Sequence, residues 1–285
     1  MFTHKFSGYF LFVFVGICLL SGFRKPSSEK GWKALFNGQD LSGWDTYLGP
    51  PFDSAGNRLN TQPLGLNNDP NHVFSVVKDN GENVIFISGQ GFGAITSKGS
   101  YQNYHVQLQF KWGKRTFGPK KGKKKDSGLL YFCVGPDGAD YGNWMRSQEF
   151  QIEEGNCGDY WGVAGAFEDI PAVKMNDTTY VYDPSVQLYT FRDHTAVGRH
   201  CIKKGDAENP TGEWNTLDLY CHGDTSVHVV NGKVMMVLYH SQQWDNGKAS
   251  SLDKGKLQIQ SEGAEVYYKN IRIRSLSSIP GELLK

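Results

Sequence analysis

The feature that most constrains this chain is an alternation of polar and apolar side chains with a period of two residues. It is regular in segments 105–112, 217–222, 256–260 and 266–274. Successive side chains of a strand point to opposite faces, so this pattern predicts half-buried strands. No window of the sequence has the spacing of a long amphipathic helix. We therefore expect an all-β fold in which two antiparallel sheets pack face to face as a sandwich.

One turn can be placed from the sequence alone. The dipeptide Asn231-Gly232 lies in the middle of the apolar segment 227–239. Asn and Gly tolerate the positive φ angles that both central residues of a type I′ turn require. We therefore predict a β-hairpin with a two-residue turn at this dipeptide.

Length and charge narrow the class of protein. The 285 residues include 13% aromatic and 21% charged residues, and a single all-β domain can be of this size. We expect one domain over residues 31–276, with a short linker at 23–30 before it and a tail at 277–285 after it. The formal net charge of +1 provides no long-range attraction to nucleic acid or to an anionic membrane, so we expect no nucleic-acid partner.

Residues 1–22 have the order of features of a secretory signal peptide. Lys5 supplies a positive charge, residues 9–20 are mostly apolar, and Ser21 and Gly22 are small residues suited to cleavage. The apolar run is too short to span a bilayer. We expect an exported protein, periplasmic or at the cell surface, without an integral membrane span.

The five cysteines fall into two groups. Cys18 lies where the cysteine of a lipoprotein can lie, but the large, β-branched Ile17 before it disfavours lipid anchoring. In an oxidising compartment the other four can form two disulfides in one of three pairings, or they can remain buried free thiols. These four are Cys133, Cys157, Cys201 and Cys221.

The most ordered group of ionisable residues lies in segment 148–154. If this segment is a strand, Glu149, Gln151 and Glu153 point to one face, and Phe150 and Ile152 point to the other. A row of carboxylates and an amide backed by apolar side chains suits acid-base chemistry on a polyhydroxylated ligand. Exposed strands also carry carboxylates that have no catalytic role, and the spacing alone leaves that alternative open.

Two segments interrupt the strand pattern. Residues 113–126 contain seven lysines and arginines together with Gly and Pro, a composition that predicts a mobile, solvated loop. Residues 156–210 mix Gly, aromatic and charged residues without sustained periodicity. Long irregular insertions in compact domains are commonly lids or binding loops, so we expect a functional insertion directly after the acidic strand.

Several short motifs occur in a fixed order along the chain. They are Gly31-Trp-Lys-Ala-Leu-Phe-Asn-Gly-Gln-Asp-Leu-Ser-Gly-Trp44, Asp126-Ser-Gly-Leu-Leu-Tyr131, Glu149-Phe-Gln-Ile152, Gly212-Glu-Trp-Asn215, Asn231-Gly232, Gly255-Lys-Leu-Gln-Ile-Gln260 and Lys269-Asn-Ile-Arg-Ile-Arg-Ser-Leu276. This series resembles the 3-keto-disaccharide hydrolase domain family, long catalogued as a domain of unknown function and abundant in exported bacterial proteins. The resemblance extends from residue 31 to residue 276.

The resemblance implies a concanavalin-like jelly roll whose concave sheet holds a sugar. It also implies an enzyme that cleaves 3-keto-glycosides, oligosaccharides or other glycosides whose sugar a partner dehydrogenase has oxidised at C3. The ketone acidifies the hydrogen on C2, so a base can form an enolate that expels the aglycone from C1, after which water can add to the enone. Such a site needs a base near C2, positive charge or donors at the C3 oxygen, and an acid near the leaving oxygen. A divalent metal can supply the second function, and the sequence leaves the cofactor open.

Within this resemblance the strand at 148–154 supplies the main candidates. We expect Glu149 to be the base or a metal ligand and Glu153 to be the second catalytic carboxylate. Gln151, between them, would orient substrate hydroxyls.

The residues that follow this strand would form the rim of the site. Asp159, Tyr160 and Trp161 are expected to bind substrate, since an aromatic ring can stack on the face of a pyranose. For Trp161 a role in surface packing remains equally open.

Histidines are the usual bases near neutral pH. We expect His194, in the long insertion, to reach over the concave face as a catalytic residue, with Arg192 beside it binding substrate, and His200 lies close enough in sequence to join them. The later histidines are expected to be structural; they are His222, His228 and His240.

One position departs from the family pattern. Many members have Leu-Gln-x-His-Gly where this chain has Glu262 within Ile259-Gln-Ser-Glu-Gly263. Any substrate or metal site built around that histidine is therefore changed in this chain.

Two other functions remain open. A direct retaining glycosidase can carry a Glu-x-Asp-x-Glu strand similar to residues 149–153, but residues four apart on a strand have Cα atoms about 13 Å apart, whereas retaining chemistry needs carboxyl groups about 5–5.5 Å apart. A non-catalytic, lectin-like carbohydrate-binding domain can have the same sandwich, because fold does not decide function.

Overall fold

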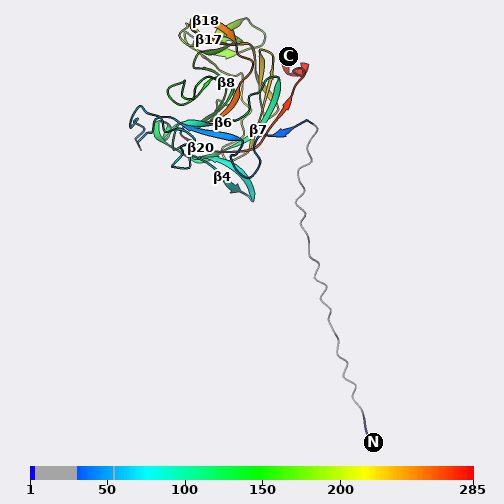
Figure 1. The fold of residues 1–285 in the computed structure, drawn as a ribbon. Helices are drawn as coiled ribbons and strands as arrows, with labels where there is room; N and C mark the ends of the chain where they lie inside the picture. The colour runs from blue at the N-terminus through cyan, green and yellow to red at the C-terminus, as the bar shows by residue number, and fades with distance from the viewer. Residues whose placement is uncertain (4–30, 54) are drawn as a thin grey trace.

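The computed structural model describes residues 1–3, 31–53 and 55–285, and over these residues the chain is built almost entirely of strands (Figure 1). The strands form two sheets, and every strand pair in them is antiparallel. The helices among the described residues are two short 3-10 segments, η1 (Gly118–Lys120) and η2 (Gly281–Leu284). The prediction of an all-β fold with two antiparallel sheets is therefore confirmed.

The larger sheet has twelve strands among the described residues. Nine of them follow one another in the order β12 (Tyr180–Tyr182), β11 (Ala166–Lys174), β17 (Lys233–Asp245), β16 (Thr225–Val230), β15 (Asn215–His222), β7 (Tyr104–Thr116), β20 (Ala264–Ser275), β5 (Glu82–Ile87) and β4 (Phe74–Asp79). Three shorter strands pair with members of this series: β1 (Lys33–Ala34) with β20, β13 (Leu188–Phe191) with β11, and β18 (Lys248–Ser251) with β17. Figure 1 shows β17 and β18 at one end of the body and β4 at the other.

The smaller sheet has eight strands among the described residues. They follow the order β14 (His200–Cys201), β10 (Tyr160–Val163), β9 (Arg146–Glu153), β8 (Asp126–Val134), β19 (Lys256–Ser261), β6 (Gly93–Ser97), β2 (Trp44–Leu48) and β3 (Gly65–Leu66). Strands from distant parts of the sequence thus lie side by side, with β19 between β8 and β6.

The core lies between the two sheets. Phe150 and Ile152 of β9 are completely buried there, with Leu108 and Phe110 of β7 and Tyr268 of β20. Burying one such apolar side chain contributes about 1.5–3 kcal/mol. A shift of β9 by one residue would exchange these side chains for carboxylates, so the core fixes the register of the strand.

The predicted hairpin is present between β16 and β17. Val230 pairs with Lys233, and the two residues between them have positive φ angles, 48° at Asn231 and 79° at Gly232. The type I′ turn and its position are therefore confirmed.

The expected irregular insertion at 156–210 is wrong as a description of local structure. It contains five strands, β10 to β14, which extend both sheets. Four of these strands have only two to four residues, and the pairing of β11 with β17 is irregular between Phe167 and Asp169. Short strands and a bulge do not produce a sustained period of two, which is why the sequence pattern fails here.

A polar cluster is enclosed in the core beneath β8 and β9. Tyr131 Oη donates a hydrogen bond to Glu168 Oε2 at 3.0 Å, and Ser226 Oγ donates to Glu168 Oε1 at 3.1 Å. Burial raises the pKa of Glu168 to about 8. His228 stacks on Phe150 with ring centroids 4.1 Å apart, and burial lowers its pKa to about 3. His228 is thus a neutral core histidine, as the sequence predicted.

The four cysteines of the domain are buried free thiols. Burial raises the pKa of Cys133, Cys157, Cys201 and Cys221. Of the two expectations for these residues, the disulfides are therefore wrong and the buried thiols are confirmed. Cys18 lies outside the described residues.

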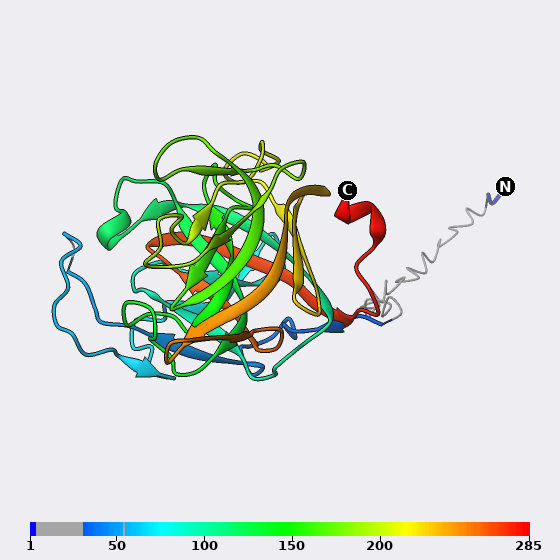
Figure 2. The ribbon, with the colours of Figure 1, turned by 90° about the horizontal axis from the view of Figure 1, so that it is seen from above.

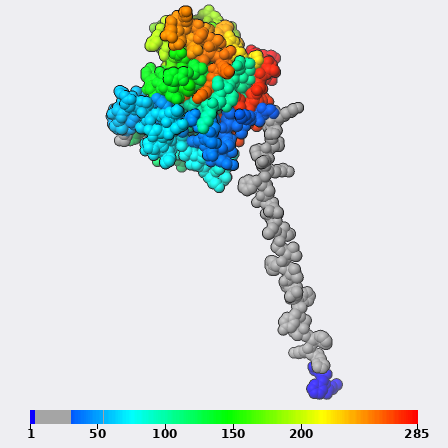
Figure 3. Space-filling view, viewed as in Figure 1, coloured from blue at the N-terminus to red at the C-terminus, as the bar shows by residue number. Residues whose placement is uncertain are grey.

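Both ends of the described fold meet on one flank. β1 pairs with β20, with Lys33 opposite Ile273, and the C-terminal 3-10 helix lies on the same side of the body (Figure 2), where it contacts β17. The space-filling view shows the early segments, in blue and cyan, gathered opposite the later strands in orange (Figure 3). The proposed signal peptide and linker lie outside the described residues, apart from residues 1–3. Within the described part of the chain, no helix is long and apolar enough to cross a membrane.

Candidate active site

A pocket of about 210 Å³ opens on the outer face of the smaller sheet. Its lining comes from the neighbouring strands β10, β9, β8 and β19 and from loops at their ends. Glu149, Gln151 and Glu153 all line it, while Phe150 and Ile152 lie in the core on the opposite face of β9. The alternation predicted for this strand is therefore confirmed, and it places three polar side chains in one open cavity.

Glu149 lies at the floor of the pocket, with 6% of its surface exposed. Burial raises its pKa well above the ordinary range, and the negative charge of Asp126 adds to that effect. The positive charge of Arg199 and a hydrogen bond from Gln260 act in the opposite direction. A carboxylate with a raised pKa inside a cleft is a candidate for proton transfer near neutral pH.

Three carboxylates gather around an ammonium group at one side of the pocket, and Glu149 lies near enough to influence one of them. Lys120 Nζ forms an ion pair with Asp126, and it lies 3.6 Å from Glu153 Oε1 and 4.0 Å from Glu262 Oε1. Burial disfavours the charged ammonium, but the attraction of Asp126 and Glu262 outweighs it and raises the pKa of Lys120. Glu149 completes the group, since its charge contributes to the raised pKa of Glu262.

The titration of this group is shifted toward neutral pH. Burial raises the pKa of Asp126 to about 7, against the opposing charge of Lys120. Burial also raises the pKa of Glu262 well above its usual range, as do the charges of Asp126 and Glu149. The carboxyl group of Asp126 can therefore exchange a proton near neutral pH.

The lysine-rich loop is only partly as predicted. Lys114, Lys121 and Lys123 are exposed, in agreement with a solvated segment. However, β7 continues to Thr116, η1 follows, and Lys120 turns inward to the pocket. The run of positive charges in the sequence does not indicate which lysine forms ion pairs with the carboxylates of the pocket. That depends on how strands β8, β9 and β19 pair in the folded sheet.

A second cation lies at the other side of the pocket. Arg199 Nη1 is 3.1 Å from Asp140 Oδ1 and 3.5 Å from Asp193 Oδ2. Burial disfavours its charge, but Asp140 and Asp193 outweigh this and raise the pKa of Arg199. The guanidinium carbon lies 5.5 Å from the ring centroid of Trp161. Arg199 was not among the residues predicted for the site, although its neighbour His200 was noted.

Trp161 lines the pocket, whereas its neighbours in sequence do not. The ring of Trp161 stacks on His200 with centroids 4.2 Å apart and planes at 11°, and His200 Nε2 lies 3.0 Å from Asp159 Oδ2. Asp159 is buried beneath this pair and also accepts a hydrogen bond from the backbone N–H of Lys203 at 3.0 Å. Asp159 thus positions the wall of the pocket.

Three other expected site residues lie elsewhere. Tyr160 points into the interior, where its hydroxyl donates to Gln148 Oε1 at 2.7 Å, because alternation along β10 sends it to the face opposite Trp161. His194 is exposed in a turn, and Arg192 lies over the ring of Trp244 at 4.0 Å. Neither of these two lines the pocket. The expectation that they reach over the acidic strand is therefore wrong.

Two buried amide oxygens in the pocket have no hydrogen-bond partner among the described residues. They are Oε1 of Gln151 and Oε1 of Gln260. Gln151 Nε2 donates to Asp126 Oδ1 at 3.2 Å, which leaves its oxygen as the free acceptor. Unpartnered buried acceptors are costly unless a ligand or water donates to them. Their position suits the hydroxyl groups of a sugar.

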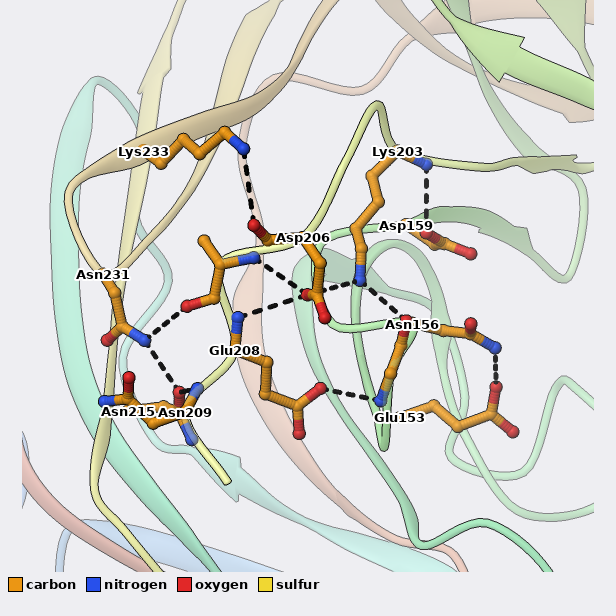
Figure 4. Close-up of polar contacts among 12 residues, drawn as sticks. Glu153, Asn156, Asp159, Lys203, Asp206, Glu208, Asn209, Asn215, Asn231 and Lys233 are labelled. Carbon is orange, nitrogen blue, oxygen red and sulfur yellow. Dashed lines mark hydrogen bonds and ion pairs between the residues drawn. The ribbon is translucent and has the colours of Figure 1, made fainter. Parts of the chain in front are cut away.

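The turn after β9 is held by the segment 203–208 (Figure 4). Lys203 Nζ donates to the carbonyl of Gly155 at 2.9 Å, and Glu208 Oε2 accepts from the N–H of Gly155 at 2.7 Å. In the same turn, Asn156 donates a hydrogen bond to Glu153. These contacts fix the end of β9 and orient the carboxylate of Glu153.

A metal site is not evident in the pocket. Across residues 1–3, 31–53 and 55–285, no group of three or more His, Cys, Asp and Glu side chains is arranged to hold a metal ion. The carboxylates of the pocket instead surround Lys120. The cation that these carboxylates contact is therefore the ammonium of Lys120.

Some signals for the missed residues are present in the sequence. Asp126 opens one of the recognised motifs, and Glu262 stands where the family commonly has histidine. Lys120 follows Gly118-Pro119, a turn-forming pair that sends the chain back toward Asp126. For Arg199 no local signal exists, because its approach depends on the pairing of β14 with β10.

The solved structures similar to this chain include carbohydrate-related proteins. Two crystal structures of putative glycosyl hydrolases from Parabacteroides distasonis are 18% and 19% identical, with TM-scores of 0.48 and 0.47. The first comparison covers 86% of this chain and 99% of the other, and the second covers 87% and 95%. A carbohydrate binding module, CBM66 from Bacillus subtilis, is 8% identical with a TM-score of 0.40, over 71% of this chain and 92% of its own. At these identities the similarity concerns the fold alone.

The comparison of the sequence with known protein families identifies the family of this chain. No protein with a curated description matches the chain. The family described as the 3-keto-alpha-glucoside-1,2-lyase-like domain matches residues 31–274, which includes every strand from β1 to β19 and nearly all of β20. The resemblance seen in the sequence motifs is confirmed, and the chain belongs to the 3-keto-alpha-glucoside-1,2-lyase-like domain family.

Proposed function

We propose that this protein cleaves 3-keto-glycosides by removing the proton from C2 of the sugar and eliminating the aglycone from C1. Membership of the family supports the substrate class. The observation that carries the proposal is the buried Glu149 on the floor of an open pocket, with Arg199 on one side and the Lys120 cluster on the other. This arrangement provides the base, the positive charge at the C3 oxygen and the acid that the reaction requires.

Glu149 is the proposed base. Its carboxylate takes the proton from C2, the electrons of the C2–H bond form the C2–C3 double bond, and the C3 carbonyl oxygen becomes an enolate. A base works best when its pKa is close to the working pH, and burial raises the pKa of Glu149 toward that range.

Arg199 is the proposed partner of the C3 oxygen. Arg199 and Glu149 line the same pocket, so a sugar whose C2 faces the base would bring its C3 ketone, one carbon away, toward the guanidinium. Asp140 and Asp193 hold the guanidinium in place. A fixed positive charge in a partly buried site stabilises the enolate more strongly than the same charge in water.

Glu262 is the proposed acid. Its side chain is on the side of the pocket away from Arg199, where Lys120 and Asp126 lie. As the enolate collapses, the C1–O bond breaks and Glu262 gives its proton to the leaving oxygen. Burial raises its pKa well above the usual carboxyl range, and a raised pKa favours the protonated form that a general acid needs.

Gln151, Gln260 and Trp161 would hold the sugar. The free amide oxygens of Gln151 and Gln260 can accept hydrogen bonds from hydroxyl groups, and Trp161 offers an aromatic surface at the wall. Glu153 would keep Lys120 oriented through their ion pair. A dehydrogenase that oxidises C3 must supply the ketone, and we place both steps outside the cytoplasm on the basis of the signal-like residues 1–22.

The experiment compares two variants that differ in position but not in chemistry. Purified protein is incubated with a 3-keto-α-glucoside and with the same glucoside before oxidation, and aglycone release and enone absorbance are followed. We expect release from the ketone only, and loss of release in Glu149→Gln. Glu213→Gln makes the same change at an exposed position outside the pocket and should retain full activity.

The other two functions predict different results. A direct glycosidase would cleave the unoxidised glucoside at a comparable rate. A carbohydrate-binding domain would bind both sugars and release nothing, with Glu149→Gln weakening the binding only. Either result would contradict the proposal.

A further inference from the structure

A second cavity, of about 470 Å³, lies beside the first. It is bounded by the loop after β2, the loop between β5 and β6, and the end of β7 with η1. Three partly exposed phenylalanines line it, Phe52, Phe92 and Phe117. No residue of this cavity has a role in the chemistry proposed above.

The two cavities share a wall. Trp144 lines the first and Phe92 lines the second, and their rings stack with centroids 6.2 Å apart. The short helix η1 contributes to both cavities: Pro119 lines the second and Lys120 lines the first. Cleavage at the first cavity would therefore release a group next to the second.

Glu262 lies where the two cavities meet. The following residue, Gly263, accepts a hydrogen bond from the N–H of Phe117 at 2.7 Å, and a side chain at Gly263 would collide with Phe117 and Lys120. Thus the proposed acid lies directly against the segment that divides the two cavities. A group bonded to the oxygen that Glu262 protonates would extend toward Phe117.

The sizes of the cavities agree with this division. Ligand pockets usually have volumes of about 300–1,000 Å³, and the first cavity alone is smaller than that. A glycoside with a ring as its aglycone needs a second space of comparable or larger size. The second cavity provides it.

The lining of the second cavity favours an aromatic ring over a second sugar. Phe52 and Phe92 lie at an angle of 57° with centroids 5.0 Å apart, a tilted arrangement that a further ring can extend. The guanidinium of Arg115 lies over Phe117 at 5.4 Å and is held by Glu265 at 2.6 Å. Asp53, which also lines the cavity, is turned to its own loop by Asn57 and Ala55.

We propose that the second cavity binds the aglycone and that this enzyme prefers 3-keto-glycosides whose aglycone contains an aromatic ring. This inference rests on the function proposed for the first cavity. Arg115 and Lys121, at the wall, would attract hydroxyl or carboxyl substituents on the ring.

The test uses benzyl and methyl 3-keto-α-glucosides, which share an alcohol leaving group and differ in the ring. We expect Phe117→Ala to raise KM for the benzyl substrate about tenfold, as the loss of aromatic packing predicts, and to change KM for the methyl substrate less than about twofold. Phe52→Ala should act in the same direction. Phe86→Ala removes a partly exposed ring on the larger sheet and should change neither value.

Binding is measured separately, by calorimetry with the unoxidised benzyl and methyl α-glucosides. We expect the intact protein to prefer the benzyl compound and Phe117→Ala to lose the preference. Equal binding of the two compounds by the intact protein, or equal effects of Phe117→Ala on both, would overturn the inference. Failure to cleave either ketone, with the preference in binding retained, would contradict the proposed reaction but support the aromatic subsite.

Discussion

The carboxylate of Glu149 fills the space above the Cα atom of Gly128 on the neighbouring strand. A Cβ atom built at Gly128 would collide with Glu149 Oε1 and with Gln260 Oε1. The backbone of Gly128 does not need positive φ, so the reason for glycine here is space for side chains of the pocket. Two residues that are distant in sequence thus define the position of the proposed base.

Gly128→Ala should therefore impair the reaction more than the fold. The added methyl group displaces Glu149 and Gln260, and a displacement of about 1 Å can cost roughly 100-fold in rate. We expect kcat/KM for a 3-keto-glycoside to fall by about that factor, with a small change in melting temperature. Gly281→Ala, at an open position, is the matched control. Unchanged turnover in Gly128→Ala would contradict the role of Glu149 as the base.

The pH dependence of turnover should reflect the raised pKa values of the pocket. The proposed base acts when deprotonated, so kcat/KM rises with pH through the pKa of the Glu149 and Asp126 group. Burial raises the pKa of Glu149 well above its ordinary range, and it raises that of Asp126 to about 7, so the acidic limb should lie clearly above the ordinary carboxyl pKa of about 4.

Lys120→Met provides a direct check on this assignment. The ammonium of Lys120 lowers the pKa of Asp126 and of Glu262. Removing it should therefore move any limb of the pH profile that depends on these two groups to higher pH, while Lys120→Arg should keep it in place. Rates are measured between about pH 4 and 9. A limb at the ordinary carboxyl pKa, or one that does not respond to Lys120→Met, would contradict the electrostatic account.

Some of this arrangement follows from the sequence and some does not. Alternation placed Glu149, Gln151 and Glu153 on one face because the apolar partners Phe150 and Ile152 dominate the register of β9. Asn231-Gly232 specified its turn because the backbone angles there are local.

What the sequence did not specify depends on distant pairings. Lys120 and Arg199 enter the pocket only because β8, β9, β19 and β14 assemble around it. Tyr160 was expected at the rim, but pairing of Tyr160 with Phe150 places it on the inner face. The short strands between 160 and 201 have too few residues to show a period.

Stability should fall as pH rises because of Glu168. The folded-state pKa of about 8 is above the value of an unfolded glutamate, about 4.3. The folded state therefore binds a proton that the unfolded state releases. The contribution is fully present below about pH 4 and is lost as pH rises to about 8, with a total on the order of a few kcal/mol.

Urea unfolding of the intact protein and of Glu168→Gln tests this sign. Glutamine keeps the shape and cannot ionise, so the variant should show a smaller decline between about pH 5 and 8, while the raised pKa values of Asp126, Glu149 and Glu262 maintain the rest. A decline of equal size in the variant would show that another group causes it.

The cysteines should behave as protected thiols. All four of the domain are buried and unpaired, and burial raises their pKa values, so a thiol reagent should not react with the native protein. After unfolding in denaturant without reductant, Cys133, Cys157, Cys201 and Cys221 should all react. Absence of reaction after unfolding would show that disulfides form in the exported protein.

The most direct measurement follows the hydrogen on C2. A 3-keto-α-glucoside carrying deuterium at C2 is incubated with the protein, and the sugar product is analysed by mass spectrometry at early times beside an enzyme-free control for exchange. Elimination through Glu149 predicts that deuterium leaves the product with every aglycone released, whether the product is the enone or its hydrate. Aglycone release with the deuterium still on C2 would contradict the proposed mechanism.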